Sequence, residues 1–224
     1  MDQDTEERFS FQHARTRMVE DQIRRRGVTD SAVLDAFLRI PRHCFVSEQY
    51  QPEAYQDHPL PIGYGQTISQ PYIVALMTEQ VNLQSSDHVL EIGTGSGYQA
   101  AILSCLCERV DTIERVTPLA NQAERIFKEL KITNVHVHVG DGTLGYPPAA
   151  PYDAILVTAG APQVPLPLKE QLKNKGRLIL PVGDRWTQVL QIWVREKGDF
   201  INESIIPVVF VPLLGKCGWE EKPQ

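Results

Sequence analysis

One segment of the chain combines an acidic residue with three glycines at alternate positions. Gly93, Gly95 and Gly97 follow a short apolar run, and Glu91 precedes the first of them by two residues. Glycines between a strand and a helix let the backbone approach a ligand, and the helix N-terminus offers free N–H groups. The dinucleotide fingerprint needs Gly or Ala at position 98, where this chain has Tyr98. The pattern favours a nucleoside that carries an amino-acid moiety, although an ordinary glycine-rich turn has the same spacing.

Two further carboxylates follow the next two predicted strands. Glu114 comes 21 residues after Gly93, a spacing at which an acidic residue of a wound sheet accepts hydrogen bonds from ribose hydroxyls. Asp141 lies between two glycines, where it could meet an adenine amino group or cap a turn. Because the carboxyl ends of parallel strands share one edge, we expect these residues and the glycines to converge on one crevice.

Strands alternate with helices around these residues. The pattern predicts strands over 89–92, 110–113, 135–139, 154–158 and 178–180, with helices over 98–106, 119–130 and 166–172. This alternation is typical of an α/β fold with a doubly wound, mostly parallel sheet. Residues 188–195 and 205–211 are separated only by a turn-rich segment, which predicts antiparallel strands at one edge.

The N-terminal part of the chain has a different texture. Helical spacing runs over 11–39 with a break at Gly27, and Thr29 or Asp30 could cap the second helix. Residues 41–66 are expected to form an ordered loop, and another helix begins near Pro71. We therefore expect one structural domain, in which 1–80 form a helical extension with a substrate and cofactor loop, and 81–224 form the α/β core.

The composition excludes several classes of protein. The 224 residues include 22 Lys and Arg against 28 Asp and Glu, so a uniformly basic nucleic-acid footprint is absent. No apolar run approaches the roughly 18 residues of a membrane span. Cys44, Cys105, Cys107 and Cys217 form neither a disulfide framework nor a CxxC motif. We expect a cytoplasmic protein that binds neither nucleic acid nor membrane, and, without an obvious heptad, a monomer.

The glycine turn and its carboxylates resemble those of the class I S-adenosylmethionine-dependent methyltransferases. Five other segments narrow the resemblance to the protein-L-isoaspartate O-methyltransferase family. They are RIPRHCFV at 39–46, GQTISQPY at 65–72, YDAILVTAGAP at 152–162, GRLILPVG at 176–183 and FVPL at 210–213. They agree in order and spacing from about residue 15 to residue 215.

The resemblance implies a Rossmann-like fold and methyl transfer from S-adenosylmethionine to the α-carboxylate of L-isoaspartyl residues. The methyl ester re-forms a succinimide that can open to normal aspartate, so the implied role is protein repair. The implied cofactor-binding residues are Thr67, Ile68, Ser69, Glu91, Gly93, Thr94, Gly95, Gly97, Glu114, Asp141 and Gly142. The implied substrate-binding residues are Gln66, Thr158, Ala159, Val211, Pro212 and Leu213, and the implied partners are isoaspartyl peptides and proteins.

Ser69 is the implied catalytic residue. A carboxylate with a reference pKa of about 4 is already ionised at neutral pH, so it needs no general base. What remains is positioning, and a serine hydroxyl can donate to the carboxylate without neutralising it. The alternative role for Ser69 is to cap the helix that begins near Pro71. Phe210–Leu213 could present main-chain groups to an extended peptide, or could be a plain edge strand.

Other readings of the sequence are weaker. His136 and His138 share one face of a predicted strand, but no third ligand is nearby, so satisfied histidines are favoured over a metal site. A nicotinamide oxidoreductase is supported by fold class alone. A non-catalytic nucleoside-binding module is the other class, and the presence of Ser69 together with Glu114 and Asp141 argues against a site that has lost its activity.

Overall fold

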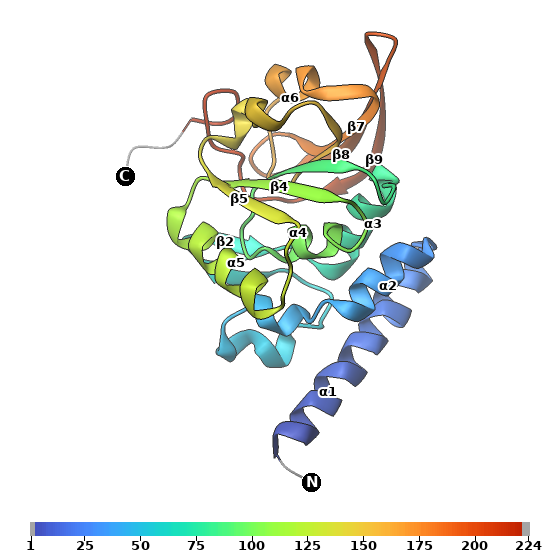
Figure 1. Ribbon diagram of the computed structural model, residues 1–224, viewed down its shortest axis with the longest axis vertical. Helices are drawn as coiled ribbons and strands as arrows, with labels where there is room; N and C mark the ends of the chain where they lie inside the picture. The colour runs from blue at the N-terminus through green and yellow to red at the C-terminus, as the bar shows by residue number, and fades with distance from the viewer. Residues whose placement is uncertain (1–2, 221–224) are drawn as a thin grey trace.

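A computed structural model describes residues 3–220 of the chain and the side chains from residue 10 onward. Its main sheet has seven strands in the order β5-β4-β3-β6-β7-β8-β9 (Figure 1). The strands are β3 His88–Ile92, β4 Arg109–Glu114, β5 Val135–Val139, β6 Tyr152–Val157, β7 Leu172–Gly183, β8 Gln188–Glu196 and β9 Asp199–Val208. β5, β4, β3, β6 and β7 are parallel, while β8 and β9 are antiparallel to their neighbours. The predicted α/β class, with antiparallel strands at the C-terminal edge, is confirmed.

Helices cover both faces of the sheet because its central strands are apolar on both sides. The helices around it are α3 Pro71–Val81, α4 Tyr98–Leu103, α5 Thr117–Glu129 and α6 Leu166–Glu170. Val89 packs into the larger core, which also contains residues of α3, α4 and α5. Leu90 and Ile92, on the same strand, pack into the second core with Leu168 of α6. Val89 and Leu90, which are adjacent along β3, therefore face the cores on opposite sides of the sheet.

The C-terminal strands differ in extent from the sequence prediction. β7 begins at Leu172 and was predicted only over 178–180, because its first half contains Lys173, Asn174 and Lys175, which are poor β-formers. β9 covers Asp199–Val208, so the predicted strand over 205–211 is wrong at its far end. The first part of β9 lacks an alternating apolar pattern because it contains exposed polar residues, which nevertheless pair with β8 through Trp193↔Asn202 and Ile192↔Glu203.

The N-terminal elements are helical up to Arg39. α1 Gln3–Arg17 projects from the rest of the chain and continues into a π-helical turn, Met18–Ile23, and a short 3₁₀ turn, Arg24–Arg26 (Figure 1). Gly27 breaks the helix with φ of 99°, as predicted. Asp30 caps α2 Ser31–Arg39 by accepting from the N–H groups of Ala32 and Val33.

The predicted loop over 41–66 contains more regular structure than expected. Two 3₁₀ segments, Arg42–Phe45 and Glu48–Glu53, precede a small hairpin of β1 Leu60–Gly63 and β2 Gln66–Ile68.

The remaining short elements lie in the α/β core, where 3₁₀ turns cover Gly142–Leu144 and Pro147–Ala149. α4 and α6 are shorter than predicted, and no helix within residues 3–220 is long and apolar enough to cross a membrane.

Candidate active site

Three adjoining cavities lie at the edge of the sheet where β3, β4 and β6 end. We call the first of them the neutral cavity because none of its described lining residues has a charged side chain. Its volume is about 440 Å³. Its lining residues are Pro59, Thr67, Ser69, Gln70, Ile73, Thr158, Thr187 and 207–211. The Glu114 cavity is lined by residues that include Gln66, Gly93, Gly95, Glu114, Gly142, Ala159, Pro212 and Leu213. The Glu91 cavity is lined by residues that include Ile68, Ser69, Glu91, Thr94, Tyr98 and Gln99.

Thr67 and Thr158 line all three cavities. Of the residues predicted to bind cofactor or substrate, all except Gly97 and Asp141 line at least one cavity. The structure thus brings together side chains from the β1–β2 hairpin, the glycine turn, the ends of β4 and β6, and the segment after β9.

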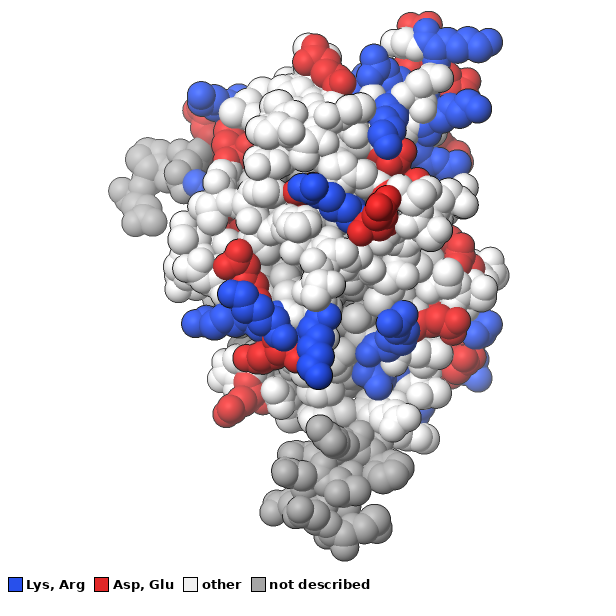
Figure 2. All heavy atoms as spheres, viewed as in Figure 1, with Lys and Arg blue, Asp and Glu red and all other residues white. Residues whose placement is uncertain are grey.

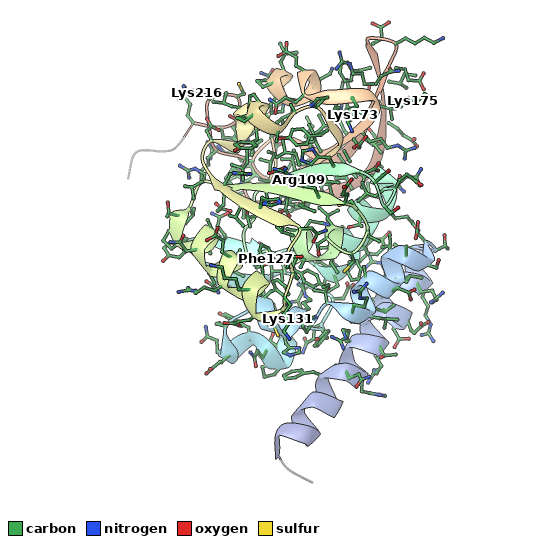
Figure 3. All side chains as sticks on the ribbon, in the orientation of Figure 1. Arg109, Phe127, Lys131, Lys173, Lys175 and Lys216 are labelled. Atoms are coloured by element: carbon green, nitrogen blue, oxygen red, sulfur yellow. The ribbon has the colours of Figure 1, made fainter. Side chains whose placement is uncertain are left out.

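At two positions of the glycine turn, Gly93 and Gly97, a side chain would clash with a neighbouring residue. Gly93 has φ of +95°, and a Cβ atom there would lie 2.5 Å from Oγ1 of Thr158. Gly97 has φ of +88°, and a Cβ atom there would lie 2.8 Å from Cζ of Phe127, which α5 provides (Figure 3). The Thr158 hydroxyl donates to the carbonyl oxygens of Ile92 and Gly93, at 3.0 and 2.7 Å. The absence of a side chain at Gly93 therefore lets the Thr158 hydroxyl lie against the turn, while Gly97 allows α5 to pack closely on it.

Glu114 holds the glycine turn from the end of β4. One carboxylate oxygen accepts from the Gly95 N–H at 2.8 Å and the other from the Val116 N–H at 2.9 Å. The side chain is buried and lines the Glu114 cavity. Because each carboxylate oxygen has two lone pairs, Glu114 can still accept hydrogen bonds from ligand hydroxyls.

Glu91 is completely buried on β3. Burial raises the pKa of its carboxyl group to about 8, and the hydrogen bond from the Thr112 hydroxyl opposes that shift. Its Oε1 atom has no hydrogen-bond partner in the described part of the chain, although the residue lines the Glu91 cavity. A buried oxygen of this kind at a cavity wall is available to a polar ligand.

Asp141 is engaged by the protein itself. Its carboxylate accepts from the N–H and the hydroxyl of Thr143 and from the Lys216 N–H. Partial burial would raise the pKa of Asp141, but these hydrogen bonds outweigh it and lower the pKa. Of the two roles considered from the sequence, the structure displays the turn cap. Its neighbour Gly142 lines the Glu114 cavity.

Ser69 lines both the neutral cavity and the Glu91 cavity. Ile68, just before it, is buried in the larger core and anchors the hairpin, whereas Thr67 faces the cavities. The N-cap of α3 is Gln70, without a side-chain cap, so the helix-cap alternative for Ser69 is wrong. The Ser69 hydroxyl makes no hydrogen bond to any residue that the structure describes, and is free to serve a ligand.

The segment 210–213 is largely occupied by contacts inside the protein. Gly160 donates its N–H to the Val211 carbonyl and accepts from the Leu213 N–H, both at 2.8 Å. Buried Gln188 accepts from the Phe210 N–H at 2.8 Å. The prediction that this main chain pairs with a peptide is therefore wrong for these groups. Val209 is 77% exposed and lines the neutral cavity.

Sequence reasoning missed several residues that shape the site. Gln188 joins the β7–β8 turn to the 210–213 segment, since its side-chain amide donates to the Asp184 carbonyl at 2.6 Å. Gln99 lines the Glu91 cavity and donates to the Thr78 hydroxyl at 2.9 Å. Arg42 is completely buried near Ser69. Its only sequence signal is its place in the segment RIPRHCFV.

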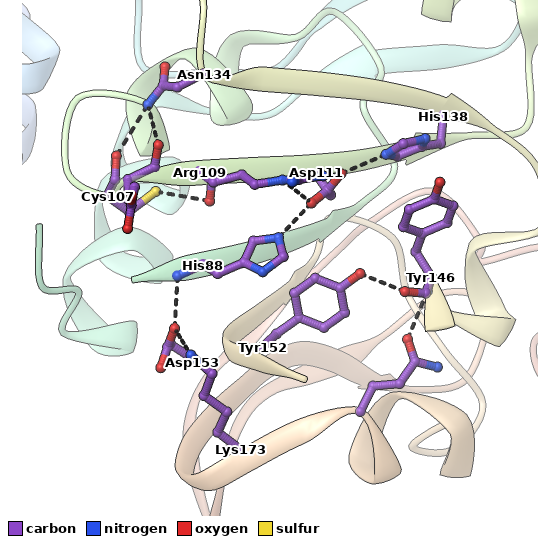
Figure 4. Close-up of polar contacts among 12 residues, drawn as sticks. His88, Cys107, Arg109, Asp111, Asn134, His138, Tyr146, Tyr152, Asp153 and Lys173 are labelled. Atoms are coloured by element: carbon purple, nitrogen blue, oxygen red, sulfur yellow. Dashed lines mark hydrogen bonds and ion pairs between the residues drawn. The ribbon is translucent and has the colours of Figure 1, made fainter. Parts of the chain in front are cut away.

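A separate polar cluster surrounds Asp111 on β4 (Figure 4). The fully buried carboxylate accepts from Arg109 at 2.9 and 3.0 Å, and contacts Nε2 of His88 at 2.5 Å and of His138 at 2.7 Å. His138 also stacks on Tyr146, with ring centroids 3.8 Å apart. None of these residues lines the three cavities, so His138 belongs to a structural network.

The sheet order, the glycine turn and the carboxylates beside it define a Rossmann-like methyltransferase. The family described as protein-L-isoaspartate(D-aspartate) O-methyltransferase matches residues 13–218, and the chain belongs to this family. It is 55% identical over 212 residues to the protein-L-isoaspartate O-methyltransferase of Trichlorobacter lovleyi, covering 94% of this chain and 98% of the relative. The Geobacter metallireducens relative is 54% identical, with the same coverage of both chains.

Solved structures agree with the sequence relatives. A protein-L-isoaspartate O-methyltransferase structure superposes with a TM-score of 0.83 at 32% identity, covering 91% of this chain and 67% of the other. A Plasmodium falciparum beta-aspartate methyltransferase (PCMT) in complex with S-adenosyl-L-homocysteine gives 0.79 at 28% identity, covering 89% and 98%. The chain is thus an S-adenosylmethionine-dependent methyltransferase that acts on L-isoaspartyl residues in protein repair.

Replacement of Glu114 by alanine should weaken binding of S-adenosylhomocysteine by about 1.5–3 kcal/mol, the value of hydrogen bonds to a charged group. The variant loses the acceptor for ligand hydroxyls and also frees the Gly95 N–H that fixes the turn. Calorimetric titration of the variant and the wild type measures the difference. Glu108→Ala, at an exposed position, is the control. An unchanged affinity in Glu114→Ala would show that Glu114 has no part in cofactor binding.

Proposed function

We propose that Ser69 holds the α-carboxylate of an isoaspartyl residue in the neutral cavity, facing a cofactor bound in the Glu114 and Glu91 cavities. The observation that carries this proposal is the place of Ser69, which lines both the neutral cavity and the Glu91 cavity. Thr67 and Thr158 line all three cavities and form the passage between them.

The residues at the two inner cavities fit S-adenosylmethionine. Gly93 and Gly95 line the same cavity as the buried Glu114 carboxylate, which suits ribose hydroxyls. The unpartnered Oε1 of Glu91 suits a polar group of the amino-acid portion. When bound, the cofactor supplies a methyl group on a sulfonium and leaves as a neutral thioether.

The neutral cavity has a wall that suits a carboxylate nucleophile. No Lys, Arg, His, Asp or Glu is among its lining residues in the described chain. A cation there would stabilise the charged substrate more than the transition state, in which the carboxylate charge is being lost. Ser69 instead offers one neutral donor, so the carboxylate is oriented and remains nucleophilic. Alignment of the reacting atoms then supplies the rate enhancement.

The remaining residues of the neutral cavity are proposed to contact the peptide on either side of the isoaspartyl residue. Val209 is exposed at the rim, and Val211 lines both the neutral and the Glu114 cavities. Ala159, Pro212 and Leu213 line the Glu114 cavity and contribute to the boundary between cofactor and substrate. Gln66 lies beside them on β2.

We also infer a monomer in a reducing cytoplasm, with one structural domain and no nucleic-acid or membrane partner. Ser69, Glu91 and Glu114 are brought to adjoining cavities within one chain. The four cysteines are free thiols. Basic and acidic side chains are interspersed over the face in Figure 2, which favours no extended polyanion surface.

Ser69→Ala tests the proposed role. Turnover of an isoaspartyl peptide should fall by about 30-fold, because one hydrogen bond to a charged group is lost. Affinity for S-adenosylhomocysteine and thermal stability should stay near the wild-type values, since the hydroxyl holds no described part of the protein. Steady-state kinetics, calorimetry and thermal unfolding on one preparation provide the three measurements. Ser47→Ala is the control at an exposed serine, and full activity in Ser69→Ala would remove the serine from the mechanism.

A further inference from the structure

Arg42 is a completely buried arginine placed directly behind Ser69. Its Nε atom donates to the Ala54 carbonyl at 2.7 Å, and one terminal nitrogen donates to the Ser69 carbonyl at 2.7 Å. The guanidinium lies 4.9 Å from the centre of the Tyr98 ring, which is the first residue of α4 after the glycine turn. Burial lowers the pKa of Arg42 to about 10, which still leaves it charged at neutral pH.

Through these contacts Arg42 holds the main chain of Ser69 in place. The Ser69 hydroxyl has no partner among the described residues, so its direction depends on the backbone that carries it. Arg42 clamps the carbonyl of that residue, and a planar guanidinium with two engaged donors allows little rotation. A shift of the carbonyl would therefore move the hydroxyl within the neutral cavity.

The second anchor of Arg42 is itself braced by the N-terminal elements. The Gln22 side chain donates to the Tyr55 carbonyl at 2.8 Å, next to Ala54. Arg26 pairs with the Asp57 carboxylate at 2.8 Å, and Gln70 donates to the Asp57 carbonyl at 3.0 Å. The segment 54–57 is thus held between the N-terminal helical turns and residues 69–70, which connect β2 to α3. Arg42 connects this braced segment to the serine.

We propose that Arg42 is a positioning residue for methyl transfer, which acts by fixing the Ser69 main chain and so the direction of its hydroxyl. The inference rests on the proposed function of Ser69. It gives the N-terminal helical turns that carry Gln22 and Arg26 a part in the reaction, because they hold the segment that anchors the far end of Arg42.

A double-mutant cycle with Arg42→Lys and Ser69→Ala tests this proposal. Lysine keeps the charge but cannot span the two carbonyls with fixed donors, so kcat for an isoaspartyl peptide should fall by about 10-fold through misalignment. Affinity for S-adenosylhomocysteine should change by less than about 2-fold. In the Ser69→Ala background, the same change should lower kcat by no more than about 2-fold, because the group that it positions is absent.

Arg177→Lys is the matched control. Arg177 also donates to a main-chain carbonyl, that of Gln80 at 3.0 Å, but it lines none of the three cavities. It should therefore lose stability without loss of kcat. Arg42→Gln provides a second variant if Arg42→Lys folds poorly.

The proposal is overturned if the kcat losses of Arg42→Lys and Ser69→Ala multiply, if Arg42→Lys keeps full kcat, or if Arg177→Lys slows turnover equally. It is also overturned if both Arg42 variants fail to fold, since Arg42 would then serve stability. If Ser69→Ala alone keeps full activity, the serine assignment fails first, and the Arg42 proposal falls with it. A failure confined to the Arg42 variants leaves the role of Ser69 intact.

Discussion

An isoaspartyl peptide is expected to be methylated about 100-fold faster than the aspartyl peptide of the same sequence, because alignment decides the rate. The two peptides carry the same net charge, so electrostatic attraction cannot separate them. They differ in position: the isoaspartyl linkage places the carboxylate directly on Cα and adds one methylene to the main chain. A cavity of about 440 Å³ with a neutral wall and one serine donor can distinguish them only by geometry.

Comparison of kcat/KM for the two peptides on one enzyme preparation measures the preference. Ser69→Ala provides the internal control, since it removes the donor and should reduce the preference together with the rate. Equal methylation of both isomers by the wild type would contradict catalysis by positioning.

Asp111→Ala is expected to lower the free energy of unfolding by about 1.5–3 kcal/mol, the cost of losing hydrogen bonds to a buried charged group whose partners are partly exposed. The substitution leaves Arg109 and the rings of His88 and His138 without their shared acceptor. Since the cluster lines none of the three cavities, kcat of the folded variant should be close to that of the wild type. Urea unfolding at neutral pH, together with steady-state kinetics, measures both quantities.

The stability contributed by Asp111 should also depend on pH. Burial would raise its pKa, but the hydrogen bonds from Arg109, His138 and His88 prevail and lower it to about 2. An unfolded aspartate has a pKa of about 3.9, so the contribution is complete above that pH and is lost as the pH falls toward 2. The difference between wild type and Asp111→Ala should therefore shrink over this interval.

Asp21→Ala is the control for that measurement. Asp21 pairs with Arg25 at 2.9 Å, but both side chains are well exposed. Its removal should cost less than about 1 kcal/mol. A loss in Asp111→Ala no larger than this would show that the buried network contributes little.

The sequence allowed prediction wherever local pattern and chemistry coincide. Gly93 and Glu114 could be placed at one crevice because parallel strands end at a common edge, and both line the Glu114 cavity. Asp30 could be proposed as a helix cap because its side chain acts on the two residues that follow it closely.

Features that depend on distant parts of the chain could not be predicted in this way. Gly160 makes main-chain hydrogen bonds to Val211 and Leu213. No local sequence pattern near residue 211 predicts these contacts. Arg42 has the residue type of a surface side chain, yet it is buried through partners 12 and 27 residues away. The Asp141 carboxylate accepts from the N–H of Lys216, 75 residues further along the chain, and no local pattern indicates this partner.

The uncharged wall of the neutral cavity has a consequence for an enzyme whose substrates are rare residues scattered over many proteins. Undamaged chains greatly outnumber damaged ones, and their ordinary carboxylates would act as competitive inhibitors of any cavity that captured anions strongly. A wall without Lys or Arg lets such segments dissociate quickly, so free enzyme stays abundant. At substrate levels far below KM, throughput depends on kcat/KM, which an interaction present only in the ground-state complex does not raise. Weak binding of undamaged segments thus keeps the enzyme available for the few damaged residues in a large population of proteins.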